Sequence, residues 1–218
     1  MKNRKGFTIV ELVIVIAVIA ILAAVLIPTF TTVTANARAS AALSTAKNAQ
    51  TAVLGNSEGT MPELTLVAVS NDKDGYAEYA FIVNERKLES VKLTDITNNN
   101  TGDKIYPAFT QTTSEGVTTY TYTVFVTADY FSEDTTKAAK VKKPVEDLVQ
   151  DVLDRQINGL QKESDAKRGS IDPTPLAAGS EYAVWTYAPQ TADATKVYKL
   201  NVYYNADIPE TAVVFFAN

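Results

Sequence analysis

The chain has 218 residues, enough for one ordinary domain and an additional segment, because single domains usually contain about 100–150 residues. It contains neither cysteine nor histidine, which excludes zinc sites built from these ligands, thiol catalysis and histidine-dependent triads. The formal net charge is −5, so the chain has no basic excess of the kind that nucleic-acid binding requires, and no nucleic-acid partner is expected.

A short basic head precedes a long apolar segment at the N-terminus. Residues 1–6 read MKNRKG, and from Phe7 to Ile27 the only charged residue is Glu11. A helix of about 20 apolar residues, with a rise of about 1.5 Å each, is long enough to cross the hydrocarbon core of a bilayer. By the positive-inside rule the basic head stays in the cytoplasm. The sequence therefore predicts a single-pass membrane helix with the remainder of the chain outside.

Glu11 is the unusual residue of this segment, because a carboxylate in hydrocarbon costs about 2.5–3.5 kcal/mol at the centre of a helix. One interpretation places it at the membrane interface, where its side chain reaches the headgroups. The other gives it a positive partner, which the helix does not supply, because the next basic residue is Arg38. If the chain were cut after Gly6, the new amino group on Phe7 of a neighbouring subunit would be such a partner.

The stretch Lys5-Gly6-Phe7-Thr8-Ile9-Val10-Glu11 resembles the prepilin (class III) signal of the type IV pilin and pseudopilin family. The resemblance covers roughly residues 5–30. It implies cleavage between Gly6 and Phe7 by the prepilin peptidase, methylation of the Phe7 amine, and pairing of Glu11 with that amine when a subunit docks. Pro28 lies where the family often has a helix-breaking proline, and a proline removes a backbone donor and kinks a helix.

The same resemblance implies a function. The mature chain is expected to be a structural subunit of an extracellular filament, assembled through its apolar helix, and not an enzyme; no cofactor or metal is expected. Its expected partners are copies of itself, other pilins, the prepilin peptidase, the cytoplasmic membrane and the pilus assembly machinery. The precursor is expected in the cytoplasmic membrane and the mature chain in a pilus at the cell surface. Many family members close their C-terminal region with a disulfide, which this chain cannot form.

Other interpretations of the N-terminal segment stay open. Ala35-Asn36-Ala37 fits the cleavage site of an ordinary secretory signal, although the apolar run is longer than the usual 7–15 or so residues of such a signal. A monomeric binding domain with a plain membrane anchor explains the apolar run, but not the position of Glu11 five residues after Gly6. A pseudopilin of a secretion or competence system carries the same signal as a pilin.

The predicted helix extends well beyond the apolar run. We expect one helix from Phe7 to about Leu54, kinked near Pro28, with Gly55 as its stop signal, because the segment after Pro28 is rich in alanine, the best helix former. One stripe is expected to face a sheet, and it consists of Leu43, Ala46, Ala49 or Gln50, and Val53. The predicted division is a leader at 1–6, a membrane or filament-core helix at 7–34, and a globular domain at 35–218.

The remainder of the chain predicts an α+β domain in which an antiparallel sheet packs on the C-terminal half of the long helix. Runs rich in β-branched and aromatic residues predict strands at Leu64–Ser70, Tyr76–Asn84, Thr118–Val126, Tyr182–Ala188, Val197–Tyr204 and Ala212–Phe216. A second helix is expected around 144–162, from a broad apolar face that includes Leu148, Val152 and Leu153.

Three groups of residues could carry chemistry but have simpler explanations. Asn71–Gly75 contains two aspartates but lacks the ligand spacing of a calcium loop, so a turn is expected. Lys137, Lys140, Lys142 and Lys143 form a basic cluster before the predicted second helix, either a solvated patch or an electrostatic subunit contact. The tyrosines and Trp185 are expected in the core and rim of the sheet.

The predicted cleavage site can be tested directly. Mass spectrometry of the native protein should show a chain that begins at methylated Phe7, whereas the Gly6→Leu variant should stay an uncut precursor, because a bulky side chain obstructs the peptidase at this position. A chain that keeps Met1 would favour the plain anchor, and a chain that begins at Arg38 would favour simple secretion. Normal processing of Gly6→Leu would contradict the family resemblance.

Overall fold

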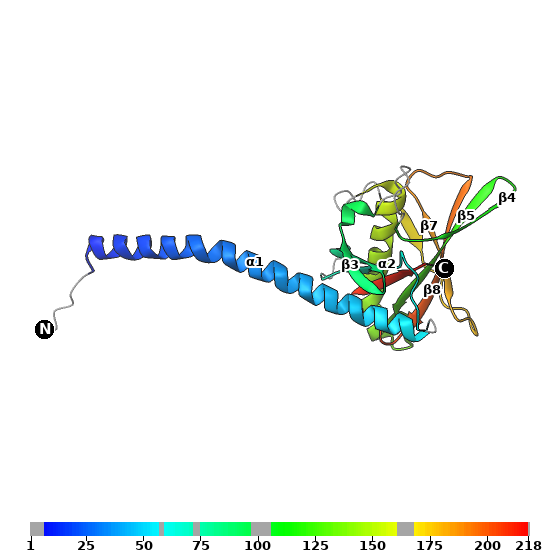
Figure 1. Cartoon of the computed structure of the whole chain (residues 1–218), viewed down its shortest axis with the longest axis horizontal. Coiled ribbons are helices and arrows are strands. Elements are labelled where there is room, and N and C mark those ends of the chain that lie inside the picture. The colour runs from blue at the N-terminus through cyan, green and yellow to red at the C-terminus, as the bar shows by residue number, and fades with distance from the viewer. Residues whose placement is uncertain (1–6, 57–58, 72–74, 97–105, 161–167, 218) are drawn as a thin grey trace. The chain divides into compact units, whose positions relative to one another are not determined.

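The computed structural model describes residues 7–56, 59–71, 75–96, 106–160 and 168–217. It divides into two compact units, residues 1–41 and residues 42–218. The long helix α1 (Ile9–Asn56) belongs to both, because its first part makes up the described portion of the first unit and its last turns belong to the second. We refer to residues 42–218 as the body (Figure 1).

Helix α1 confirms the predicted long N-terminal helix, but its bounds differ slightly. It begins at Ile9 and continues through Gly55 to Asn56, so Gly55 is not the stop signal that the sequence suggested. A glycine inside a helix costs only about 1 kcal/mol relative to alanine, which is too little to end a long helix by itself. The Gly59 amide donates to the Leu54 carbonyl oxygen at 3.1 Å, so a backbone bond still closes the helix end after the glycine.

The body contains one mixed sheet of nine strands in the described residues. The order across the sheet is β3-β2-β1-β9-β5-β8-β7-β6, and β4 pairs with β5. The strands are β1 (Leu66–Val69), β2 (Tyr79–Asn84), β3 (Lys87–Val91), β4 (Thr110–Ser114), β5 (Val117–Thr127), β6 (Ser170–Asp172), β7 (Ala183–Ala188), β8 (Lys196–Asn205) and β9 (Ala212–Phe216). Their pairings are antiparallel except that of β5 with β8, which is parallel.

The six predicted strands are confirmed, with ends that differ by up to three residues. Three strands were not predicted, because none carries the apolar pattern of a buried strand: β4 is fully exposed and polar, β3 is charged and mostly exposed, and β6 has three residues. The parallel pair was also missed. Both β5 and β8 lie in the middle of the sheet, and which strand lies beside which depends on long-range contacts that local pattern does not encode.

The second helix is confirmed, but it is α2 (Thr135–Asn158) and begins nine residues before the predicted start at Pro144. Asp134 caps it by accepting bonds from the amides of Thr136 at 2.9 Å and Lys137 at 3.3 Å. Pro144 lies inside the helix, where it removes one backbone bond without ending it. The helix ends before Gly159, whose positive φ of 63° forms the C-terminal cap, so Leu160 lies beyond the helix.

The two helices cover opposite faces of the sheet within the body. Alternate residues of one strand point to opposite faces, so the partners of each helix identify its face. Val141, Val145, Leu148, Val152 and Leu153 of α2 pack with Leu66 and Ala68 of β1, Tyr122 and Val124 of β5, and Trp185 of β7. The C-terminal turns of α1 pack with Val67 and Val69 of β1, Phe125 of β5, and Ala212 and Val214 of β9.

The α1 face of the core is built largely from small side chains. Ala42, Ala46, Ala49 and Val53 have no exposed surface, and Leu43 is half-buried beside them. This confirms the predicted stripe and adds Ala42 to it. Because alanine projects only a methyl group, the helix axis can lie close to the sheet, and Phe81 and Phe125 belong to the same buried cluster. Trp185 is completely buried on the other face, as expected.

The last turns of α1 should therefore be part of the folded body. A fragment of residues 35–218 should be soluble and folded, whereas a fragment of residues 56–218 should be less stable or aggregate, because it exposes Val67, Val69 and Val214. Losing the buried Val53 alone should cost about 1.5–3 kcal/mol. Thermal unfolding of the two fragments, followed by circular dichroism, checks this, and equal melting temperatures would contradict the assignment of these turns to the core.

Candidate functional site: the N-terminal helix

The start of α1 is a capping box formed by Thr8 and Glu11. The Thr8 backbone amide and hydroxyl both donate to Glu11 Oε2, at 2.9 and 2.6 Å, and the Glu11 amide donates to Thr8 Oγ1 at 3.3 Å. In such a box the capping side chain and the carboxylate three residues later satisfy each other's unpaired donors. Glu11 therefore has a role in its own chain, which helps to explain how a carboxylate is held at the start of an apolar helix.

The reciprocal bonds leave part of Glu11 available. Both bonds that it accepts go to Oε2, and no hydrogen bond reaches Oε1 in the described residues. The side chains of Glu11 and Phe7 are both exposed, and no hydrogen bond joins these two described residues. One chain alone thus does not bring Glu11 to its own Phe7. Gly6, the other residue of the predicted cleavage site, lies outside the described residues.

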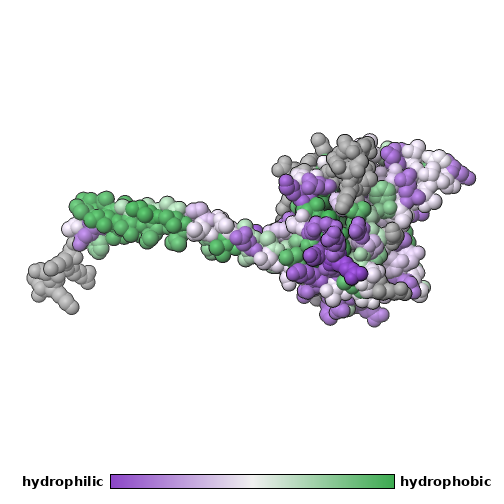
Figure 2. All heavy atoms as spheres, viewed as in Figure 1, coloured by the Kyte–Doolittle hydropathy of each residue, from purple (hydrophilic) through white to green (hydrophobic). Residues whose placement is uncertain are grey.

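The first part of α1 exposes almost every apolar side chain that it carries. Fourteen leucine, isoleucine and valine residues between Ile9 and Ile27, together with Phe7 and Phe30, have 47–81% of their surface exposed. Figure 2 shows these side chains as a continuous apolar surface along the helix. Among the described helices, this is the one long and apolar enough to cross a membrane, and its most apolar 18-residue window has no buried residue. A surface of this size marks a lipid or protein contact.

The turn around Pro28 carries four threonines whose hydroxyl groups are satisfied within the helix. Thr29 Oγ1 donates to the Leu26 carbonyl oxygen at 2.9 Å, and Thr31 and Thr32 both donate to the Pro28 carbonyl oxygen, at 2.9 and 3.0 Å. Thr34 donates to the Phe30 carbonyl oxygen at 3.0 Å. Such bonds let polar residues lie in an apolar environment. Pro28 lies inside α1 as expected, and the kink there stays a prediction.

The body contains a buried ionic network that the sequence did not reveal. Asp151 and Arg155 of α2 pair at 2.9 Å with 4% of each side chain exposed. Asp154, one turn further, pairs with Arg168 at 3.0 Å. Asp154 also accepts bonds from the Tyr187 hydroxyl and the Gly169 amide, both at 2.7 Å, and from Asn158 at 3.0 Å.

This network has a structural explanation. Two carboxylates and two guanidinium groups balance in charge, and Tyr76 stacks on Arg168 with the guanidinium carbon 4.5 Å from the ring centre. Burial lowers the pKa of Arg168, but the hydrogen bond to Asp154 and the charge interactions with Tyr76, Asp154 and Asp151 together outweigh burial, so the pKa is raised and Arg168 stays charged. Burial and the bond to Asp154 raise the pKa of Tyr187, so it stays neutral. The network therefore connects α2 to the segment before β6 and to β7 through ion pairs and hydrogen bonds, which is a structural role.

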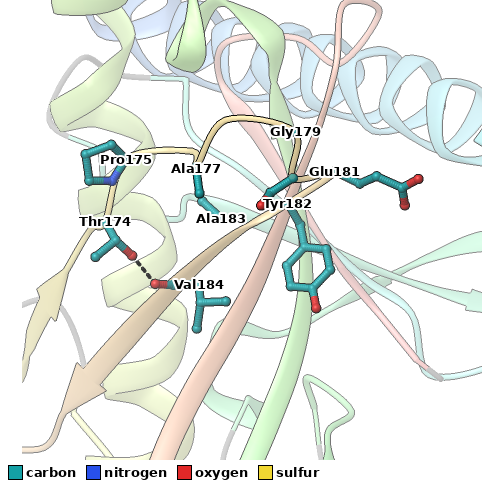
Figure 3. Close-up of a pocket in the computed structure, with 9 residues that line it drawn as sticks. Thr174, Pro175, Ala177, Gly179, Glu181, Tyr182, Ala183 and Val184 are labelled. Carbon is teal, nitrogen blue, oxygen red and sulfur yellow. Dashed lines mark hydrogen bonds between the residues drawn. The ribbon is translucent and has the colours of Figure 1, made fainter.

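A shallow groove lies under the loop between β6 and β7 (Figure 3). Its walls come from Thr174, Pro175, Ala177 and the segment Gly179–Val184. The Thr174 hydroxyl donates to the Val184 carbonyl oxygen and closes the loop. Glu181 and Tyr182 diverge in Figure 3, so no two reactive groups face each other in the groove. In the described residues no group of three or more acidic side chains could hold a metal ion, and most of the predicted turn at 71–75 lies outside those residues.

Comparisons with known proteins concern the N-terminal segment. Residues 1–27 match the family model described as the prokaryotic N-terminal methylation motif. Over 28 residues the chain is 79% identical to the type IV wide pilus major component PilA4 of Thermus thermophilus. That match covers 13% of this chain and 21% of the relative, so the chain spans about a fifth of the relative's length. No solved structure matches the chain. Both matches confirm the type IV pilin resemblance that the sequence predicted at the N-terminus.

The structural role of the ionic network predicts a strong effect of neutralising Asp154. Asp154→Asn removes the nearer carboxylate of Arg168 and leaves Asp151, 4.0 Å away, as its partner; breaking a buried pair typically costs about 3–5 kcal/mol, which is the upper bound for the expected loss. Chemical unfolding of the 35–218 fragment measures the loss. The matched control is Asp193→Asn, which removes an exposed partner of Lys196 and should change stability little. Equal effects of the two substitutions would contradict the structural role.

Proposed function

We propose that the mature chain is a structural subunit of an extracellular type IV pilus-like filament. The observation that carries the proposal is the junction of the methylation motif with an exposed apolar helix. The motif is consistent with cleavage between Gly6 and Phe7, and the helix that follows has no cover for its side chains among the described residues of the first unit. Cleavage and methylation at Phe7 and docking through Glu11 belong to this proposal.

The physical argument begins with the apolar surface. Each fully buried valine, leucine or isoleucine gains about 1.5–3 kcal/mol relative to water, and α1 carries fourteen of them in an exposed state before Pro28. In the precursor, acyl chains cover these side chains. Outside the membrane only protein can cover them, and copies of the same helix are the simplest partner because each copy has the same need. Stacked helices then form the core of a filament.

Glu11 gives this stacking a fixed register. In a stack of apolar helices, sliding one helix along another changes the contacts only gradually, whereas a charged pair forms in a single position. Cleavage after Gly6 creates a new cation, the Phe7 amine, close to the capping box. Glu11 Oε2 is engaged with Thr8, which leaves Oε1 to accept a bond from the Phe7 amine of a neighbouring copy.

The proposed division of the chain follows from these roles. Residues 1–6 are the leader that is removed, residues 7–34 are the membrane anchor and later the filament core, and residues 35–218 are the exposed globular domain. The precursor is held in the cytoplasmic membrane with its basic head inside, and the mature chain is part of a cell-surface pilus. Its partners in this proposal are other pilin copies, the prepilin peptidase and the pilus assembly machinery.

The second candidate is a pseudopilin of a secretion or competence system, which the same motif favours equally. Such a protein would use the same cleavage and the same helix. A monomeric membrane-anchored binding domain is less well supported, because it requires neither the methylation motif nor a carboxylate at position 11. The described residues of the body add no reactive cleft that would favour an enzyme.

The docking role of Glu11 predicts the behaviour of two variants. Glu11→Ala should be cleaved and inserted normally but should assemble poorly, because the Phe7 amine of the neighbour loses its partner in the filament core at about 3–5 kcal/mol per subunit. Glu11→Asp keeps the charge but is one methylene shorter, so its filament yield should be intermediate. The measurement compares filaments sheared from cells with the subunit that stays in the membrane.

A matched control separates docking from capping, since Glu11 also closes the capping box. Thr8→Val removes the partner hydroxyl but leaves the carboxylate, so it weakens the helix start by about 1 kcal/mol and should assemble better than Glu11→Ala. If Glu11→Ala gave as many filaments as the wild-type chain, the docking role would be wrong. Equal losses in Thr8→Val and Glu11→Ala would assign the effect to capping alone.

A further inference from the structure

A row of lysines lies along the exposed side of α2. Lys137, Lys140 and Lys143 are spaced three residues apart and are exposed, whereas Val141 and Val145 between and after them are buried. Lys143 pairs with Asp147, but Lys137 and Lys140 have no carboxylate partner in the described residues. The segment Thr135–Lys143 contains lysines and no acidic residue, in a chain whose net charge is negative.

The sequence suggested that these lysines precede the second helix. In the structure they lie within α2. The position matters because a helix holds its side chains at fixed spacing, whereas a loop does not. Their position in the helix also weakens the interpretation of the lysines as an ordinary solvated patch. Lys137 lies in the first turn, where the helix macrodipole favours acidic residues, so the helix itself does not gain from this lysine. Asp134 at the cap is the acidic compensation nearest along the chain.

A pocket with negative charge, opposite to that of the lysines, lies at the C-terminal end of α1 in the body. It is open to solvent and is lined by Asn48, Thr51, Ala52 and Gly55 of α1 and by Asn205 and Asp207. Asn205 fixes the turn between β8 and β9 against the helix, because its Nδ2 donates to the Ala52 carbonyl oxygen at 3.2 Å. Its side-chain oxygen accepts a bond from the Asp207 amide at 2.7 Å.

The pocket is suited to an ammonium group. The C-terminus of a helix carries about half a negative charge, and α1 has no basic residue in its last turn to neutralise it. Asp207 adds a full negative charge, and the exposed Glu210 lies three residues further along the same turn. Asn48 and Thr51 add oxygen atoms to the lining. Lys47 is the opposing charge on this part of α1, next to Asn48 in sequence and outside the lining residues.

The two features lie on opposite faces of the sheet. The lysines are on the outer side of α2, which covers one face, and the pocket is at the end of α1, which covers the other. A contact between them therefore joins different surfaces of two copies. Such a heterologous contact repeats from copy to copy and produces an open helical assembly when it does not close into a ring, whereas a contact between identical surfaces stops at a dimer.

We propose that Lys137 and Lys140 of one copy dock against the pocket of Asn48, Asn205 and Asp207 on a second copy. This surface rests on the proposed function, since it adds a second contact, between bodies, to the stacking of the apolar helices. The complementary charge of the two surfaces selects a second copy of this chain as the partner. The contact is exposed at its rim, so it weakens as the ionic strength rises.

A charge-swap experiment in the full-length chain tests the contact. Lys137→Glu/Lys140→Glu and Asp207→Lys/Glu210→Lys should each lower the filament yield about fivefold or more, because like charges then meet. The quadruple variant, with both changes in one chain, should recover at least half of the yield of the wild-type chain. The matched control is Lys87→Glu, an exposed lysine on β3, which should assemble normally. Cleavage at Phe7 should be normal in every variant.

A second measurement does not depend on filament yield. The chain has no cysteine, so a Lys140→Cys/Asp207→Cys variant introduces one pair into a clean background. Under oxidation in cells it should give a ladder of covalent multimers on a non-reducing gel, because each copy then joins two neighbours. Lys140→Cys alone should give dimers at most, and Lys87→Cys/Asp207→Cys should give no ladder.

The possible outcomes separate this inference from the proposed function. Charge-swap recovery together with the ladder supports the contact. Filaments at wild-type yield from Lys137→Glu/Lys140→Glu would overturn it. So would a quadruple variant that recovers no yield, and so would the absence of a ladder. If Glu11→Ala blocks assembly while the lysine variants assemble normally, the subunit function stands and this contact does not. If Glu11→Ala assembles normally, the docking role fails whatever the lysines do.

Discussion

The apolar surface on the first half of α1 is the constraint on which the rest of the molecule depends. Its leucine, isoleucine and valine side chains are exposed, and an apolar surface of this size marks a contact with lipid or with protein. In the proposed function, lipid supplies that environment to the precursor and other copies of the helix supply it in the filament. The surface is uniform around the helix, which suits a lipid bilayer and a bundle equally well. Hydrophobicity alone therefore does not fix how deep or in which register the helix sits.

Polar groups in this half of the helix are arranged so that they do not oppose burial. The Thr8 and Glu11 side chains satisfy each other, and the hydroxyl groups around Pro28 return to backbone carbonyl oxygens. Among the side chains of this half, Glu11 keeps one carboxylate oxygen, Oε1, that accepts no hydrogen bond in the described residues. A helix that is apolar everywhere else responds strongly to one such group, because an unpaired charge in a low dielectric costs far more than any single methylene contact gains. Register can thus depend on one residue.

The sequence predicted the long helix, six strands and the alanine stripe because these elements carry strong local patterns. It missed β3, β4 and β6, which are charged, polar or very short. It placed the start of α2 too late because Pro144 suits the first turn of a helix. The Thr8–Glu11 capping box could have been found from the T-x-x-E spacing. Arg168 could not have been paired with Asp154 from sequence, since no local pattern indicates that these two side chains meet. The roles of Gly6, Phe7 and Glu11 stay predictions.

A body without disulfide bonds needs another way to hold its C-terminal strands, and the ionic network supplies one. Asp154 connects α2 to Arg168 and Gly169, just before β6, and to Tyr187 in β7, so three segments distant in sequence meet at one carboxylate. Gln150 adds a bond to the Gly169 carbonyl oxygen at 2.9 Å. A buried ion pair gives little net stability compared with an apolar contact, but it penalises any packing in which one partner loses the other. Its main effect is therefore on specificity: it fixes where β6 and β7 lie on α2.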